Sequence, residues 1–83
     1  MALNAMDGQS LELGELHDAV ARLAVDSDAA VAAGDARRGS MLLFHAAGLV
    51  EKFLATWTLD EDVVVSLRNM VAEYRGAAQA MQV

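Results

Sequence analysis

The side chains that could do acid–base or metal chemistry are few in this chain of 83 residues. Its two histidines, His17 and His45, fall in separate predicted helices, and no serine–histidine–aspartate spacing is present. The carboxylate run Asp60-Glu61-Asp62 lacks the ligand spacing of a calcium loop and suits the N-terminal end of a helix. The sequence therefore predicts no catalytic residue, no metal site and no cofactor, and a non-enzymatic function. A small enzyme or ligand-binding bundle that uses one histidine is the least favoured alternative.

The composition narrows the classes of partner. A net charge of −6 repels phosphate backbones and anionic lipid surfaces, so nucleic-acid and membrane-surface binding are not expected. A basic partner would be attracted, although an acidic charge also serves solubility alone. The absence of cysteine excludes disulfides and thiolate zinc sites. The first ten residues do not resemble a signal peptide, and the longest uncharged run, 39–50, is too short to span a bilayer, so a cytoplasmic location without membrane insertion is expected.

The elements that would position a binding surface are helices, because the chain has many alanines, few aromatic residues and no proline. Residues 1–9 are predicted to form a flexible tail, with Asp7-Gly8 as a helix breaker. Ser10 can then cap a first helix over about 11–33. The apolar or small residues of its stripe recur with helical spacing. They are Leu13, Leu16, Val20, Leu23, Ala24, Ser27 and Val31.

Gly34 and Asp35 predict a tight turn, since glycine ends helices and aspartate caps the next one. A second helix is expected over about 36–56. Gly39 and Gly48 lie inside it, where each costs about 1 kcal/mol relative to alanine, so both are predicted to be points of close helix–helix approach. The apolar stripe beyond Gly39 comprises Leu42, Ala46, Leu49, Val50, Phe53 and Trp57.

Thr58 and Glu61 match a capping box that would start a third helix. Three helices of similar length with short turns predict an all-α fold, an antiparallel three-helix bundle over residues 10–83. The second helix carries apolar residues beyond its stripe, which makes it either the central element or one side of a binding groove. Packing of this surplus in the core is an equally good interpretation. The surplus consists of Met41, Leu43, Phe44 and Ala47.

The segments LAVDSDAAVAAGDARRGSMLLFHAAGLVEKFL and SLRNMVAEYRGAAQAM together resemble the MIT (microtubule interacting and trafficking) domain family. Members are three-helix bundles of about this length. The matching features are Leu23-Ala24, the turn Ala33-Gly34-Asp35, Ala46, Leu67, Glu73-Tyr74 and Ala78, and they run without gaps from about Leu16 to Met81. Where the family pattern of the third helix has a leucine and a glutamate, this chain has Arg75 and Gln79.

The resemblance implies an adaptor module for protein transport and endosomal sorting, with a cytoplasmic, endosome-associated location. Its expected partners are peptide tails of ESCRT-III-like proteins, or another trafficking or autophagy protein. Tail helices would bind between the second and third helices, and extended peptides between the first and third. The first groove would involve Met41, His45, Gly48, Met70, Tyr74, Arg75 and Ala78, and the second Leu16, Val20 and Ala24.

Two other interpretations of the helical pattern stay open. The surplus apolar residues of the second helix would also suit self-association, in a homo-oligomeric or autophagy-related scaffold bundle. The Gly34-Asp35 turn is also similar to that of one tetratricopeptide unit, but that family needs several 34-residue repeats, and no repeat is present here.

Overall fold

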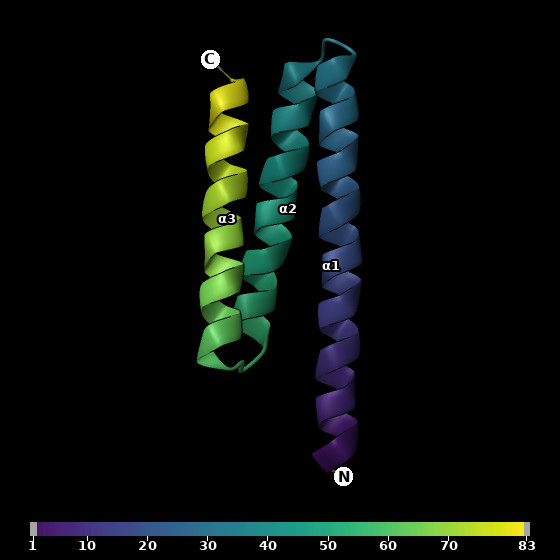
Figure 1. Ribbon diagram of the computed structural model, residues 1–83, viewed down its shortest axis with the longest axis vertical. Coiled ribbons are helices and arrows are strands. Elements are labelled where there is room, and N and C mark those ends of the chain that lie inside the picture. The colour runs from purple at the N-terminus through teal and green to yellow at the C-terminus, as the bar shows by residue number, and fades with distance from the viewer. Residues whose placement is uncertain (1, 83) are drawn as a thin grey trace.

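A computed structural model describes the backbone of residues 2–82 and the side chains of residues 13–82. It has three helices, α1 (Ala2–Ala32), α2 (Ala36–Thr56) and α3 (Glu61–Met81), and no strand within the described residues. The chain runs up α1, down α2 and up α3, so that successive helices are antiparallel (Figure 1). The predicted all-α, antiparallel three-helix bundle is confirmed.

The start of α1 differs from the prediction. The helix begins at Ala2, so the predicted start at Ser10 is wrong, and the Asp7-Gly8 pair predicted to break it lies within the helix. The residues before Ser10 include alanine, leucine, methionine and glutamine, which are strong helix formers, and one glycine costs only about 1 kcal/mol. The first turns of α1 therefore extend beyond the turn between α2 and α3 (Figure 1).

The turn between α1 and α2 confirms its prediction. Gly34 has a φ of 86°, a conformation that residues with a Cβ atom adopt reluctantly. Its N–H donates to the carbonyl of Val31 at 2.9 Å, and the N–H of Asp35 donates to that of Ala30 at 2.8 Å, the two bonds of a Schellman motif. The Asp35 carboxylate also accepts from the N–H of Arg38 at 3.0 Å. Asp35 therefore both completes the end of α1 and caps α2.

The start of α3 differs in detail. Its N-cap is Asp60, whose side chain makes no capping hydrogen bond, so the predicted Thr58–Glu61 capping box is wrong. Glu61 becomes the first helical residue rather than the third, too early to reach back to a cap. The helix start is stabilised instead by Glu61 and Asp62, whose negative charges lie at the positive end of the helix dipole.

Helix α2 is the central element of the bundle. It packs against both α1 and α3, whereas no Cα atom of α1 lies within 8 Å of one in α3 in the described structure. The centre of the core takes side chains from all three helices and is surrounded by partly buried leucine, valine, methionine and aromatic residues. The central residues are Val20, Ala46, Val50, Phe53 and Leu67.

Small residues bring α2 close to both neighbours near the turn between α1 and α2. The buried Ser27 hydroxyl on α1 donates to the carbonyl of Gly39 at 2.8 Å, and the buried Ser40 hydroxyl on α2 donates to the carbonyl of Ala78 on α3 at 2.8 Å. Gly39 is buried, so its predicted role as a close-contact position is confirmed. The same prediction for Gly48 is wrong, because this glycine is exposed and a Cβ atom there would meet nothing within 4 Å.

Candidate partner-binding grooves

A pocket of about 290 Å³ forms a groove between α1 and α3, which have no Cα atoms within 8 Å of each other in the described structure. We call it the Met70 pocket. The α1 wall carries Leu13 and His17 one helical turn apart, and the α3 wall carries Val63 and Met70 two turns apart. Buried Leu67 of α3 also lines the pocket, and Asp62 and Ser66 complete the lining. The pocket combines an apolar surface with a carboxylate at its edge.

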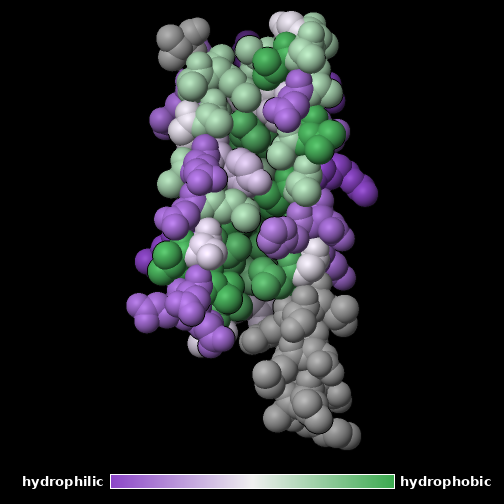
Figure 2. Space-filling view, viewed as in Figure 1, coloured by the Kyte–Doolittle hydropathy of each residue, from purple (hydrophilic) through white to green (hydrophobic). Residues whose placement is uncertain are grey.

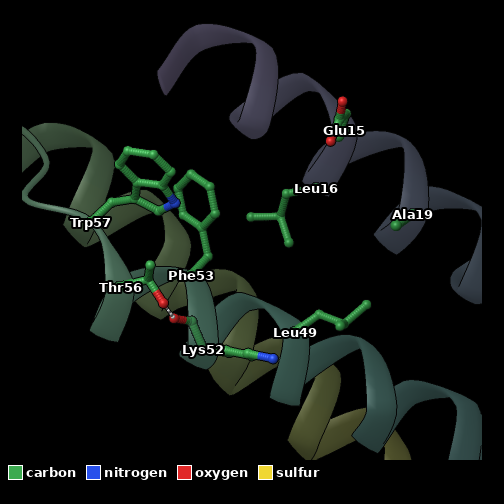
Figure 3. A pocket seen from close by; sticks show the side chains of 8 residues that line it. All are labelled: Glu15, Leu16, Ala19, Leu49, Lys52, Phe53, Thr56 and Trp57. Carbon is green, nitrogen blue, oxygen red and sulfur yellow. Dashed lines mark hydrogen bonds between the residues drawn. The ribbon is translucent and has the colours of Figure 1, made fainter. Parts of the chain in front are cut away.

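A second pocket, of about 440 Å³, lies between α1 and α2, and we call it the Trp57 pocket. Leu16 points from α1 towards α2, and Leu49 and Phe53 of α2, with Trp57 at its C-cap, point towards α1 (Figure 3). The Phe53 and Trp57 rings pack with their centroids 6.2 Å apart at an interplanar angle of 37°. The remaining lining residues are Glu15, Ala19, Lys52 and Thr56, so an acid on α1 and a base on α2 share this pocket.

The side where α2 meets α3 is bridged rather than open. Arg75 of α3 forms an ion pair with Glu51 of α2, and both side chains stay about half exposed. Such an exposed pair contributes about 0–1 kcal/mol. Arg75 stands where the MIT pattern has leucine, so this chain has a charged link across the surface where the resemblance predicts a binding groove.

The residues predicted for a groove between the second and third helices are not brought together. Met41, His45 and Gly48 are exposed and share one face of α2, with spacings of four and three residues. That face differs from the one that meets α3, which includes the buried Ser40. Met70 instead lines the pocket between α1 and α3. Of the other predicted residues, Tyr74 packs half-buried against the core, Arg75 pairs with Glu51, and Ala78 is fully buried.

The residues predicted for a groove between the first and third helices are also dispersed. Leu16 lines the Trp57 pocket between α1 and α2, Val20 is buried at 2% exposure in the core, and Ala24 is half-buried. The residues of α1 that do face α3 in the Met70 pocket are Leu13 and His17. Leu13 belonged to the predicted stripe, and His17 follows it by four residues. Helical spacing could therefore have indicated both.

The surplus apolar residues of α2 are largely accounted for by its central position. Leu43 and Ala47 are buried and Phe44 is half-buried, whereas Met41 is 65% exposed. Figure 2 shows hydrophobic side chains gathered along the middle of this face of the molecule, with hydrophilic ones on both sides and some among them. Packing rather than a separate surface therefore explains most of the surplus on α2.

The described residues contain no group of three or more histidine, aspartate or glutamate side chains that could hold a metal ion. Both histidines are exposed, and only His17 lines a described pocket. None of the described helices is long and apolar enough to cross a membrane. What the described side chains offer is apolar pockets with charged edges, which is the chemistry of peptide and protein recognition.

Comparison with known proteins adds no relative. No family model matches the chain, and neither a curated protein nor a solved structure gives a match. The class that the fold and the grooves define is a small three-helix bundle with a central α2 and pockets along both sides of α1.

Proposed function

We propose that this chain is a non-enzymatic adaptor module that binds peptide tails of other proteins in the groove between α1 and α3. The observation that carries the proposal is the separation of these two helices. Large side chains on their facing sides, such as Leu13 and Met70, leave the Met70 pocket between them. Interaxial distance depends on the side chains at the contact, so these walls leave room for an inserted side chain.

The chemistry of the groove favours an apolar anchor with basic neighbours. The Met70 pocket, at about 290 Å³, is at the lower end of the range for small-molecule sites, which suits inserted side chains of a peptide better than a drug-sized ligand. Asp62 lines it, and Glu61 follows Asp60 at the same end of α3. An apolar residue would enter the pocket while lysine or arginine residues beside it meet these carboxylates.

The MIT resemblance supplies the expected source of such peptides. It supports tails of ESCRT-III-like proteins as partners and an endosome-associated place for the protein that carries this module. The ion pair between Arg75 and Glu51 favours the groove between α1 and α3 over the side where α2 meets α3.

Titration of labelled ESCRT-III-type tail peptides, followed by NMR chemical-shift changes, tests this proposal. We expect binding with the largest shifts at Leu13, Val63 and Met70, and its loss in Met70→Glu, which buries a carboxylate in the apolar pocket. Val65→Glu is the matched control, because Val65 is on the same helix, is 51% exposed and does not line the pocket. Absence of binding by every tail at about 1 mM would refute the trafficking role, and shifts confined to α2 would refute the choice of groove.

A further inference from the structure

The face formed by α1 and α2 carries charges that are paired by position but not by contact. Glu15 of α1 and Lys52 of α2 line the Trp57 pocket together. Near the other end of the two helices, Asp26 of α1 and Arg38 of α2 line another pocket, of about 480 Å³, which we call the Arg38 pocket. No ion pair joins either couple among the described side chains, and all four are exposed. At both levels α1 presents an acid and α2 presents a base, and Asp35, the N-cap residue of α2, also lines the Arg38 pocket.

This arrangement is complementary to itself. A twofold axis that runs parallel to α1 and α2, in front of the face they form, would place α1 of one copy over α2 of another. Each acid would then meet the base of the same level in the partner, Glu15 against Lys52 and Asp26 against Arg38. The α1 and α2 helices of the two copies would then form a four-helix bundle. Because α1 and α2 are antiparallel within one copy, every neighbouring pair of helices in this bundle would also be antiparallel.

The sizes and the apolar character of the side chains along this face also suit a helix as the partner. The α1 side presents the small residues Ala19 and Ala29 in the two pockets, which allow a second helix to approach closely. The α2 side presents Leu49 and Trp57 in the Trp57 pocket. Tryptophan in a desolvated pocket is among the residues that contribute most to protein–protein association. The pockets extend over about 20 Å of α1, from Glu15 to Ala29.

We infer that the face formed by α1 and α2 binds the same face of a second copy of this chain, with two Glu15–Lys52 and two Asp26–Arg38 pairs across a twofold axis. Arg22, which lies between the two acids on the same side of α1 by helical spacing, would face the level of His45 rather than a lysine or arginine. The groove between α1 and α3 stays free in this dimer. The inference therefore stands or falls independently of peptide binding in the Met70 pocket.

A charge-reversal variant distinguishes the proposed contacts between the two copies from a general effect of net charge on association. Glu15→Lys moves the net charge of −6 by two units towards zero, which reduces repulsion between two copies. The proposed pairs predict the opposite sign, because the introduced ammonium group would face Lys52 of the second copy, and the twofold axis repeats this contact. We expect the dissociation constant of the dimer to rise at least about tenfold, since two favourable exposed pairs become two repulsive ones.

The test is sedimentation equilibrium of the full chain from about 10 µM to about 1 mM, at low salt. We expect a dimer for the unmodified chain, weaker dimers for Glu15→Lys and Lys52→Glu alone, and recovery when the two variants are mixed, because each then supplies the charge that the other lacks. Glu73→Lys on α3 is the matched control, since it makes the same change in net charge at an exposed position outside both pockets.

Three outcomes would overturn the inference. The first is an unmodified chain that stays monomeric at about 1 mM. The second is a dimer that Glu15→Lys and Glu73→Lys affect equally. The third is a mixture of the two single variants that associates no better than either variant alone. Because recovery on mixing requires both variants to be folded, it also excludes misfolding as the reason for the loss.

Discussion

Gly39 is where the packing of the bundle can be tested with one substitution. A Cβ atom added there would lie 2.8 Å from Cγ2 of Val31, 3.2 Å from the carbonyl oxygen of Ser27 and 3.3 Å from Sδ of Met81. The first contact is shorter than side-chain carbons tolerate, and the second is to backbone, which cannot rotate away. Gly39→Leu places a whole side chain on this atom, so α2 has to move away from α1.

Three contributions determine how much stability Gly39→Leu is expected to lose. Overpacking of a close contact costs about 1–3 kcal/mol. Separation of the helices also weakens the 2.8 Å hydrogen bond from Ser27 to the Gly39 carbonyl, which contributes about 1 kcal/mol. Replacing a helical glycine returns about 1 kcal/mol of helix propensity. The net result is a destabilisation of about 1–3 kcal/mol, which lowers the melting temperature of a domain of this size by roughly 5–20 °C.

Gly48→Leu is the matched control, because it makes the same change in the same helix where nothing lies within 4 Å. It should stabilise the chain by up to about 1 kcal/mol through helix propensity alone. Circular dichroism melts and urea titrations at one chain concentration measure both variants. Equal shifts for the two leucines would refute the close approach of α1 and α2 at Gly39. A further check is Val31→Ala in a Gly39→Ala background, which should recover part of the loss by removing the nearest contact atom.

Three further predictions concern the contacts that hold the helices and the turn. Ser40→Ala should destabilise the chain by about 1 kcal/mol in urea titration, because it removes the buried hydrogen bond to the Ala78 carbonyl, and an unchanged midpoint would contradict that bond. Gly34→Ala should cost about 1–2 kcal/mol by the same measurement, since it forces a Cβ atom into a φ of 86°, and a stabilised variant would show that the turn rearranges freely. Arg75→Ala should change stability by no more than about 1 kcal/mol, because its ion pair with Glu51 is exposed, whereas a larger loss would indicate an unrecognised packing role.

The elements of the fold were predictable from the sequence where local chemistry decides them. Gly34 and Asp35 placed the end of α1 and the start of α2 correctly, because a left-handed glycine followed by a capping aspartate has few other uses. The start of α1 was not predictable in the same way. Gly8 opposes the helix only by about 1 kcal/mol, which a run of good helix formers offsets.

The binding surface was less predictable, because it depends on how α2 is rotated about its own axis. Successive residues of a helix point about 100° apart, so Met41 and Ser40 belong to different faces although they are adjacent. A broad apolar stripe on α2 is compatible with either residue facing α3, and the MIT resemblance predicts Met41 there. The contact that selects the rotation is the hydrogen bond from Ser40 to Ala78, which joins residues far apart in the chain.

Residue size also explains why the Met70 pocket lies between α1 and α3. Near the turn between α1 and α2, the residues where α2 meets its neighbours are small, so the helices approach closely there. They are Ser27 and Gly39 on one side and Ser40 and Ala78 on the other. The facing sides of α1 and α3 carry larger residues such as Met70, and helices separated by large side chains leave pockets between turns. Met70→Ala should therefore weaken peptide binding while leaving the fold intact. Enlarging Ser40 should instead unfold the bundle.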